Sequence, residues 1–392
     1  MRGAFDAGGR DRLDEAMARY VERGVVPAAV WALARHDETH VAHAGASSYG
    51  GESIGADAIF RLSSMTKPIT ALLTLALIED GAFSLDEPVG RLLPELAAPR
   101  VLRDIAGPIE DTVAATRAIT VRDLLTFTNG FGAYFGPSPT IERAMALGVA
   151  VSPPAPAAAP APDEFVARLA SLPLLVQPGE RWLYHTGADL LGVLITRATG
   201  QPFERVLDER VLAPLGMRDT AFYADESRRD RLVTSYATDV ATGGVVVYDE
   251  PDGQWARPPA FASGGAGLVG TVADYLAFAR LLASGGGDVL SREGVALMTT
   301  DHLSDAQKRV SGFYPDDFDT RGWGMGVSVV TTEVAPSAPV GQYGWNGGMG
   351  TVWRNDPGRD LTAILLTNVA WTSPRPPEIV NEFLDLAYRA LN

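Results

Sequence analysis

The chain has 392 residues, enough to bury a large core in one big domain or two interlocked domains. Its 48 acidic and 33 basic residues give a net charge of −15, which argues against nucleic acid or an anionic membrane as a partner. It contains no cysteine, so disulfides, thiol nucleophiles and thiolate metal sites are excluded. The N-terminus has no apolar core of the kind an export signal needs, and no apolar run approaches the roughly 20 residues that span a bilayer. We therefore expect a soluble cytoplasmic protein.

The N-terminal part predicts a helix followed by two strands. Apolar residues recur at helical spacing over residues 11–24. Residues 27–47 then have the pattern of two strands joined by a tight polar turn at Asp37-Glu38.

The middle of the chain is helical in pattern. Residues 152–165, SPPAPAAAPAPDEF, interrupt it, and we interpret them as an extended surface excursion rather than a linker, because helical pattern resumes at once. Helices with punctuating residues nearby are predicted at 64–80, 119–127, 163–172 and 186–199.

The C-terminal part returns to short strands, at 321–331, 348–357 and 360–368, followed by a helix near 377–391. Since both chain ends supply strands and one covering helix, the natural way to bury them is one sheet. The sequence thus predicts an α+β fold, an antiparallel sheet flanked by N- and C-terminal helices with an inserted, mostly helical region. We expect a sheet domain of 1–61 plus 231–392, a helical domain of 62–230 and an active site in the cleft between them.

Two serines compete for the role of nucleophile. Gly51-Glu52-Ser53-Ile54-Gly55 has the letters of an esterase elbow, but that turn must follow a buried strand and precede a helix. Here a small, polar stretch precedes the motif and a strand-like stretch follows it. We therefore interpret Ser53 as a loop serine.

Ser64 lies at the start of a strongly apolar helix, where free amides and the helix dipole favour a developing oxyanion. Lys67, three residues on, shares its face, and burial would make this lysine a better proton acceptor. The alternative, a helix cap beside a solvated lysine, is common for Ser-x-x-Lys alone. The rest of the chain decides between them.

Acyl transfer through a serine also needs a proton carrier and an oxyanion hole. Tyr184 precedes a helix at a loop corner, and beside a cationic Lys67 its phenolate could accept the proton of Ser64. The glycine-dense stretch 342–361 predicts an edge strand whose Gly348 amide completes an oxyanion hole with that of Ser64. A core tyrosine and a hairpin turn are the structural alternatives.

The order of these motifs resembles the penicillin-recognising serine hydrolases, and within them family VIII carboxylesterases and class C β-lactamases. The blocks DAIFRLSSMTKPIT, ITVRDLLTFTNGF, QPGERWLYHTGADLLG, GGAGLVGTVADYLAFARLL and YGWNGGMGTVWRNDP carry the likeness over nearly the whole chain. It implies Ser64 as nucleophile, Lys67 as its activating partner and Tyr184 as proton shuttle, with the amides of Ser64 and Gly348 in the oxyanion hole.

Two departures from class C β-lactamases bear on the substrate. Their Tyr-x-Asn becomes Tyr184-His185-Thr186, so the amide that grips a β-lactam side chain is absent. Their Lys-Thr-Gly becomes Trp345-Asn346-Gly347, which removes a carboxylate-binding cation, about 1.5–3 kcal/mol of charge-assisted hydrogen bonding. A tryptophan there favours neutral, apolar groups, as in family VIII esterases. The aromatic residues Phe131, Tyr134 and Phe135 are further candidates for the cleft, unless they only pin their loop.

The sequence therefore predicts a serine carboxylesterase that hydrolyses neutral, short-acyl esters through a Ser64 acyl-enzyme, without metal or cofactor. His36 and His40 lie around a predicted strand turn rather than on a helix, so they do not form a metal pair. His185 could tune the site, but the sequence favours a packed or exposed histidine. The alternatives are a β-lactamase or D-amino-acid peptidase, an acyltransferase, and a catalytically silent ligand-binding protein.

Overall fold

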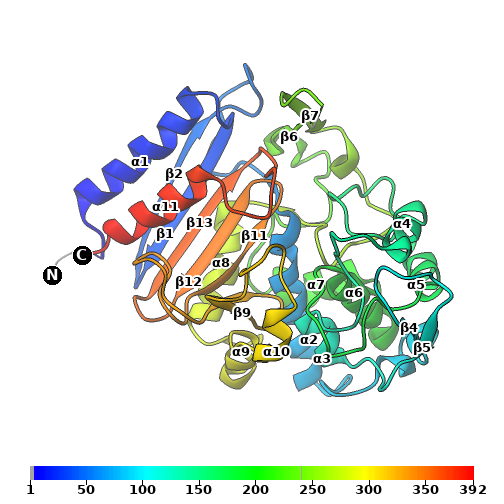
Figure 1. Cartoon of the computed structure of the whole chain (residues 1–392). Coiled ribbons are helices and arrows are strands. Elements are labelled where there is room, and N and C mark those ends of the chain that lie inside the picture. Colours follow the sequence, from blue (N-terminus) through cyan, green and yellow to red (C-terminus); the bar gives the residue numbers. More distant parts are fainter. Residues whose placement is uncertain (1–3, 240) are drawn as a thin grey trace.

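The computed structural model describes residues 4–239 and 241–392. Its main sheet has seven strands in the order β2-β1-β13-β12-β11-β10-β9, and every neighbouring pair is antiparallel (Figure 1). The strands are β1 Ala28–Arg35, β2 Glu38–Gly45, β9 Arg321–Trp323, β10 Ser328–Val330, β11 Tyr343–Gly347, β12 Thr351–Asp356 and β13 Leu361–Thr367. Because β1 pairs with β13, the two ends of the chain meet in one sheet, as the sequence predicted.

Both faces of this sheet are buried. Along β1, Val30 and Ala32 belong to the large central core, whereas Trp31 and Leu33 pack under two helices on the opposite face. These helices are α1 Ala7–Glu22 and α11 Glu378–Arg389 (Figure 1). The Asp6 side chain caps α1 by accepting a hydrogen bond from the Gly9 amide. On the inner face lies α8 Val272–Ala283, packed against β13 and β1.

The second half of the molecule is mainly helical and lies beside the sheet (Figure 1). It contains α2 Thr66–Glu79, α3 Val121–Thr126, α4 Pro139–Ala146, α5 Pro162–Ala170, α6 Thr186–Thr199 and α7 Phe203–Leu207. Shorter pairs of strands are β3 Phe60–Arg61 with β8 Val269–Gly270, β4 Arg100–Leu102 with β5 Thr112–Ala114, and β6 Ser235–Thr238 with β7 Val245–Asp249. The helices α9 Arg292–Met298 and α10 Asp305–Arg309 precede β9.

Helix α2 runs between the sheet and the helical half (Figure 1), and every residue from Thr66 to Leu77 is buried. One continuous apolar core includes Val30 of β1, Leu72 of α2 and Leu194 of α6, so it extends through both halves. The expected domain boundaries at residues 62 and 230 stay a prediction.

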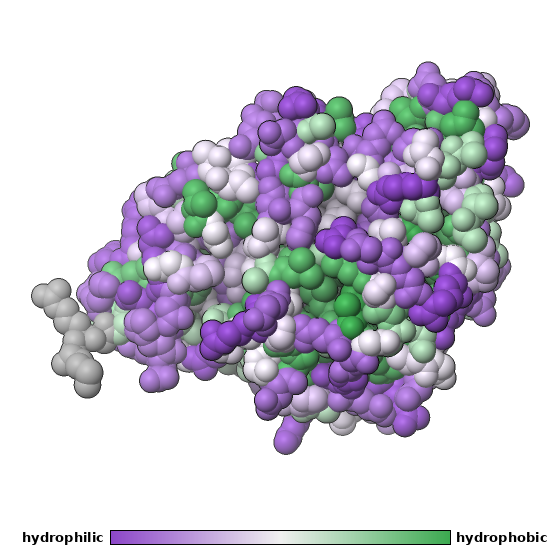
Figure 2. Space-filling view, turned by 90° about the horizontal axis from the view of Figure 1, so that it is seen from below, coloured by the Kyte–Doolittle hydropathy of each residue, from purple (hydrophilic) through white to green (hydrophobic). Residues whose placement is uncertain are grey.

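The α+β class and the flanking helices are confirmed, with two local corrections. The β1–β2 turn is His36-Asp37, one residue earlier than predicted, because Arg35 pairs with Glu38. Strand β11 is interior rather than an edge, since β10 and β9 extend the sheet beyond it. Among the described residues, no helix is both long and apolar enough to cross a membrane. Seen from below, apolar side chains gather in the middle of the molecule, between more polar flanks (Figure 2).

Candidate active site

Ser64 lies in a short 3-10 helix, Ser63–Met65, that leads directly into α2. The preceding strand β3 is pinned by β8, and Ser63 adopts a left-handed backbone with φ of 47°. Such a conformation is strained for a residue other than glycine and concentrates at functional sites. Ser64 is half-buried between buried neighbours at the start of a helix.

Lys67 is 1% exposed, and its ammonium nitrogen contacts three groups. Nζ lies 3.0 Å from Ser64 Oγ, 2.6 Å from the Gly265 carbonyl oxygen and 3.0 Å from His185 Nδ1. Burial lowers the pKa of Lys67 to about 7, and the charge of Asp189 raises it by less. A substantial fraction of this lysine is therefore neutral near neutral pH, as a general base must be.

Tyr184 contacts both Ser64 and Lys67. Its ring centroid lies 4.4 Å from Lys67 Nζ, and its hydroxyl accepts a hydrogen bond of 2.7 Å from Trp345 Nε1. Burial raises the pKa of Tyr184, although hydrogen bonds with Ser64 and Trp345 partly oppose that shift. Burial thus disfavours the phenolate that we expected beside a cationic Lys67, whereas it favours the neutral amine of Lys67.

Sequence reasoning missed the third partner of Lys67. His185 Nδ1 faces the lysine, and His185 Nε2 lies 3.0 Å from Asp189 Oδ2. The other oxygen, Asp189 Oδ1, accepts hydrogen bonds from Ser263 Oγ and the Gly265 amide, at 2.6 and 3.0 Å. The available signal was the spacing of His185 and Asp189, which places both on one face at the start of α6.

The end of β11 packs closely on the segment before Ser64. A side chain at Gly347 would bring Cβ within 2.2 Å of the Leu62 carbonyl oxygen, so only glycine permits this approach. Gly348 follows the strand in an exposed turn. Its assignment to the oxyanion hole stays a prediction.

Trp345 is 6% exposed and packs among aromatic rings that include Tyr184 and Trp323. It therefore positions the tyrosine hydroxyl, besides any contact with substrate. Asn346 is half-buried, and its Oδ1 has no hydrogen-bond partner among the described residues.

The other predicted binding residues differ in how far they are buried. Phe131 is 2% exposed within the central core, and its place in the cleft stays a prediction. Tyr134 packs under Arg181, while Phe135 is 71% exposed and its ring lies 6.3 Å from that of Phe313. Thr186 is buried at the start of α6.

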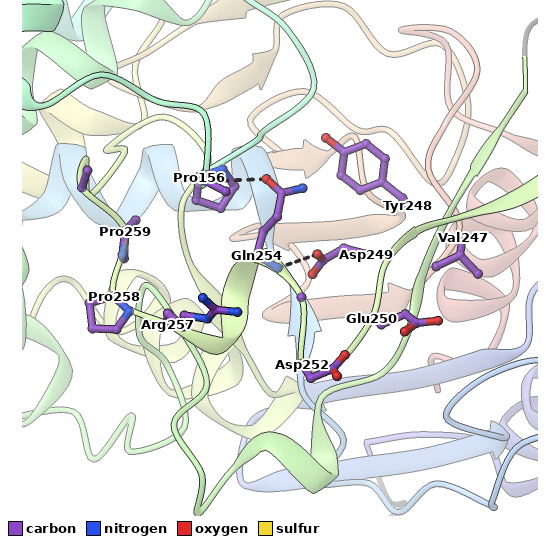
Figure 3. Close-up of a pocket in the computed structure, with 13 residues that line it drawn as sticks. Pro156, Val247, Tyr248, Asp249, Glu250, Asp252, Gln254, Arg257, Pro258 and Pro259 are labelled. Atoms are coloured by element: carbon purple, nitrogen blue, oxygen red, sulfur yellow. Dashed lines mark hydrogen bonds between the residues drawn. The ribbon is translucent and has the colours of Figure 1, made fainter.

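A mostly apolar cavity of about 480 Å³ adjoins this site. Its lining includes His185, Thr186 and Asp189, together with Phe165, Trp255 and Phe261 and most of the Pro/Ala segment at 151–160. A second hollow, shown in Figure 3, lies around Tyr248, Asp249 and Gln254 and is lined by neither Ser64 nor Tyr184. Neither hollow is lined by Ser64, Lys67 or Tyr184, but the first reaches His185, which contacts Lys67.

The rejected motifs have structural contacts elsewhere. Ser53 forms an isolated bridge with Ala46 and is exposed. His36 contacts Asp360 and His40 contacts Asp14, so the two imidazoles go to different carboxylates.

A serine whose hydroxyl meets a buried lysine and a tyrosine, beside an antiparallel sheet covered by helices on both faces, defines a serine hydrolase of the β-lactamase fold. The chain belongs to the Beta-lactamase family, whose model matches residues 13–383.

Two relatives and one solved structure show what this chain is similar to. Protein Rv1367c of Mycobacterium tuberculosis is 39% identical over 323 residues, covering 79% of this chain and 77% of that protein. Esterase EstB of Burkholderia gladioli is 31% identical over 388 residues, covering 93% and 92%. The solved structure of "EstCE1, a hydrolase with promiscuous acyltransferase activity" superposes with a TM-score of 0.80 at 24% identity, covering 97% and 98%, and supports the fold alone.

Proposed function

We propose that this protein is a serine carboxylesterase that hydrolyses neutral esters through a Ser64 acyl-enzyme. The observation that carries the proposal is the meeting of Ser64 Oγ with the Lys67 amine at 3.0 Å, with the Tyr184 ring against the same amine. The similarity to Esterase EstB over 93% of the chain supports ester chemistry rather than another use of the fold.

In acylation, neutral Lys67 takes the proton of Ser64 while the serine oxygen bonds to the ester carbonyl carbon. The tetrahedral oxyanion lies at the amides of Ser64 and Gly348. Its collapse breaks the bond to the alcohol oxygen, which is protonated by the pair of Lys67 and Tyr184. In deacylation, water gives a proton to Lys67 and attacks the carbonyl carbon of the acyl-enzyme. The bond to the Ser64 oxygen then breaks, that oxygen receives the proton, and the acid is released.

The electrostatics of the cleft support a neutral substrate. Trp345 stands on the strand where a carboxylate-binding cation would be needed, and the nearby Arg321, which lies 5.4 Å from the Trp345 ring, is paired with Asp317 at 2.6 Å. A substrate carboxylate would therefore have to compete with an existing ion pair.

The length of the acyl group stays a prediction. The sequence favoured short acyl chains, but the adjoining cavity of about 480 Å³ has room for longer ones. A panel of p-nitrophenyl esters of increasing acyl length, measured in the wild type and in Ala159→Trp, distinguishes short from long acyl chains. The Ala159→Trp substitution narrows the cavity. Ala157→Trp is the matched control, because Ala157 lines the hollow of Figure 3 instead. If long chains enter the cavity, only the first variant loses turnover of octanoate relative to butyrate, about fourfold for each methylene no longer buried.

A fluorophosphonate probe tests the nucleophile. We expect it to label the wild-type protein and not Ser64→Ala, while Ser53→Ala is labelled as the wild type is. Labelling that persists in Ser64→Ala would defeat the mechanism, and no labelling of any variant would favour a silent binding protein.

Two other reactions remain as rivals. Rapid hydrolysis of nitrocefin without turnover of p-nitrophenyl butyrate would indicate a β-lactamase or D-amino-acid peptidase. Acyltransfer differs only in the acceptor, and EstCE1 is a hydrolase with promiscuous acyltransferase activity. Product analysis with an added alcohol measures how the acyl-enzyme partitions between water and the acceptor.

A further inference from the structure

We propose that His185, held by Asp189, is a positioning residue that turns the lone pair of Lys67 toward the Ser64 hydroxyl. The inference rests on the proposed function of Ser64 as nucleophile and adds a pair of residues to it.

The hydrogen bonds of Lys67 leave one direction open for its lone pair. A neutral amine has two N–H donors and one lone pair, on a flexible stem that does not itself fix their directions. Around Nζ lie the Gly265 carbonyl oxygen, which can only accept, His185 Nδ1 and Ser64 Oγ. If His185 Nδ1 is also an acceptor, both donors are used and the lone pair is left for Ser64.

Asp189 determines that His185 Nδ1 is an acceptor. Burial by itself would raise the pKa of Asp189, but His185, Ser263 and Lys67 together lower it, so the group is an acceptor-only carboxylate. Its Oδ2 therefore accepts a hydrogen bond from the Nε2–H group of His185, which leaves Nδ1 without a proton in the neutral ring. Burial and the charge of Lys67 lower the pKa of His185, which keeps the ring neutral.

The same arrangement suits the charged lysine. After Lys67 takes the serine proton, its three N–H groups face three acceptors: the Gly265 oxygen, His185 Nδ1 and the Ser64 oxygen. The site therefore needs no reorganisation when the proton moves, which is the condition for efficient electrostatic stabilisation.

The backbone supplies an independent observation. His185 has φ of 86° and ψ of −61°, and the Thr186 amide bonds to the Tyr184 carbonyl oxygen at 3.3 Å, which together define a γ-turn of the rare, strained kind. Such strain persists only where the surroundings impose it, and it clusters at functional sites. Gly265 makes room for the ring, because a Cβ there would lie 2.8 Å from His185 Nε2.

The groups that face His185 come from three elements. Lys67 approaches from α2, Asp189 from α6 and the Gly265 backbone from the loop before β8, while the neighbouring Tyr184 ring lies 5.9 Å away. Lys67 and Asp189 are thus the charged partners whose removal should alter the imidazole.

The first test is the tautomer of His185. In protein labelled with ¹⁵N-histidine, assigned by loss of one signal in His185→Phe, we expect the neutral Nε2–H form at pH 8. In Asp189→Asn, the Gly265 amide retains the side-chain oxygen, the amide nitrogen donates to Nε2, and the proton moves to Nδ1. Asp360→Asn, which alters the exposed His36–Asp360 pair, is the matched control and should leave His185 unchanged. A charged or Nδ1–H ring in the wild type overturns the proposal.

The second test is the labelling rate of Ser64 by a fluorophosphonate against pH, which needs no knowledge of the natural ester. Removing the acceptor in His185→Phe should slow labelling about 10- to 100-fold, as expected for a misdirected base. His185→Asn, whose side-chain oxygen can accept from Lys67, should recover most of the rate. Because Asp189 raises the pKa of Lys67, Asp189→Asn should shift the rise of the labelling rate with pH to lower pH.

Different outcomes defeat the proposed function and the positioning role. Wild-type protein that is not labelled at Ser64 defeats the proposed function. Normal labelling of Ser64 with an unchanged rate and pH profile in folded His185→Phe and Asp189→Asn defeats the positioning role alone.

Discussion

At the scale of single residues, the proposed mechanism makes activity depend on the pKa of Lys67. Burial lowers that pKa to about 7, and only the deprotonated amine can accept the serine proton. The value of kcat/KM for p-nitrophenyl butyrate should therefore rise with pH through about 7 and level off above it.

The matched substitution is Lys67→Arg, which keeps a cation that cannot deprotonate. It should lower kcat/KM by about 10²- to 10⁴-fold over the whole range, the usual contribution of a general base. A pH profile that is flat between 5 and 9, or an active Lys67→Arg, would contradict the role of this lysine.

The contribution of the Tyr184 hydroxyl to kcat is predicted to be larger for esters whose leaving group must be protonated as it departs. Tyr184→Phe keeps the ring within its aromatic cluster but removes the hydroxyl that we propose relays a proton to the departing alcohol. We expect a large loss of kcat for ethyl esters and a smaller one for p-nitrophenyl esters, because p-nitrophenolate leaves without being protonated. Equal losses for both leaving groups would assign the hydroxyl to serine activation or packing instead.

At the scale of elements, the contact between β11 and the segment before Ser64 aligns the two sides of the site. Gly347→Ala would place Cβ within 2.2 Å of the Leu62 carbonyl oxygen, so the strand or the nucleophile segment must move. We expect a loss of about 1–3 kcal/mol in the free energy of unfolding, as for other overpacked sites, together with lower kcat. Urea unfolding and ester kinetics measure the two effects.

The neighbouring Gly348 provides the stability control for that variant. A Cβ there meets nothing within 4 Å, so Gly348→Ala should unfold at the wild-type urea concentration. If both variants are equally stable, the close approach of β11 is not what requires glycine at position 347.

At the scale of the whole molecule, a buried ion pair joins segments that are distant in sequence. Arg61, in the strand before Ser64, donates to Asp249 at 3.0 Å and to the Val233 carbonyl oxygen at 2.6 Å, and both side chains of the pair are almost fully buried. Asp249 also accepts a hydrogen bond of 2.7 Å from the backbone amide of Gln254 (Figure 3). The pair thus connects the nucleophile's strand to the segment after β7.

Asp249→Asn leaves a buried guanidinium without its counter-charge and should cost about 3–5 kcal/mol of unfolding free energy. Asp111→Asn, which breaks the exposed pair of Arg103 and Asp111, should cost less than about 1 kcal/mol. Chemical denaturation of both variants checks the contrast, and similar small losses would show that the buried pair is not needed for stability.

The class of fold could be predicted because its signals are local. Apolar residues at helical spacing mark α1 and α11, and alternating or continuous apolar runs mark β1, β2 and β13. The interior position of β11 was not predicted, because the sequence indicated a strand at 321–331 but not that this segment divides into β9 and β10 and pairs beyond β11.

The sequence by itself determined that Ser64 and Lys67 share one face of a helix start, because three residues correspond to almost one turn. It also limited the metal and redox chemistry, through the absence of cysteine. Only the tertiary structure decided which groups surround Lys67, that its pKa falls to about 7, and that His185, bonded to Asp189, is one of its hydrogen-bond partners. The physical reason is that desolvation and hydrogen-bond direction depend on atoms from segments up to 198 residues apart, as in the bond from Lys67 to Gly265, and spacing along the chain does not contain that information.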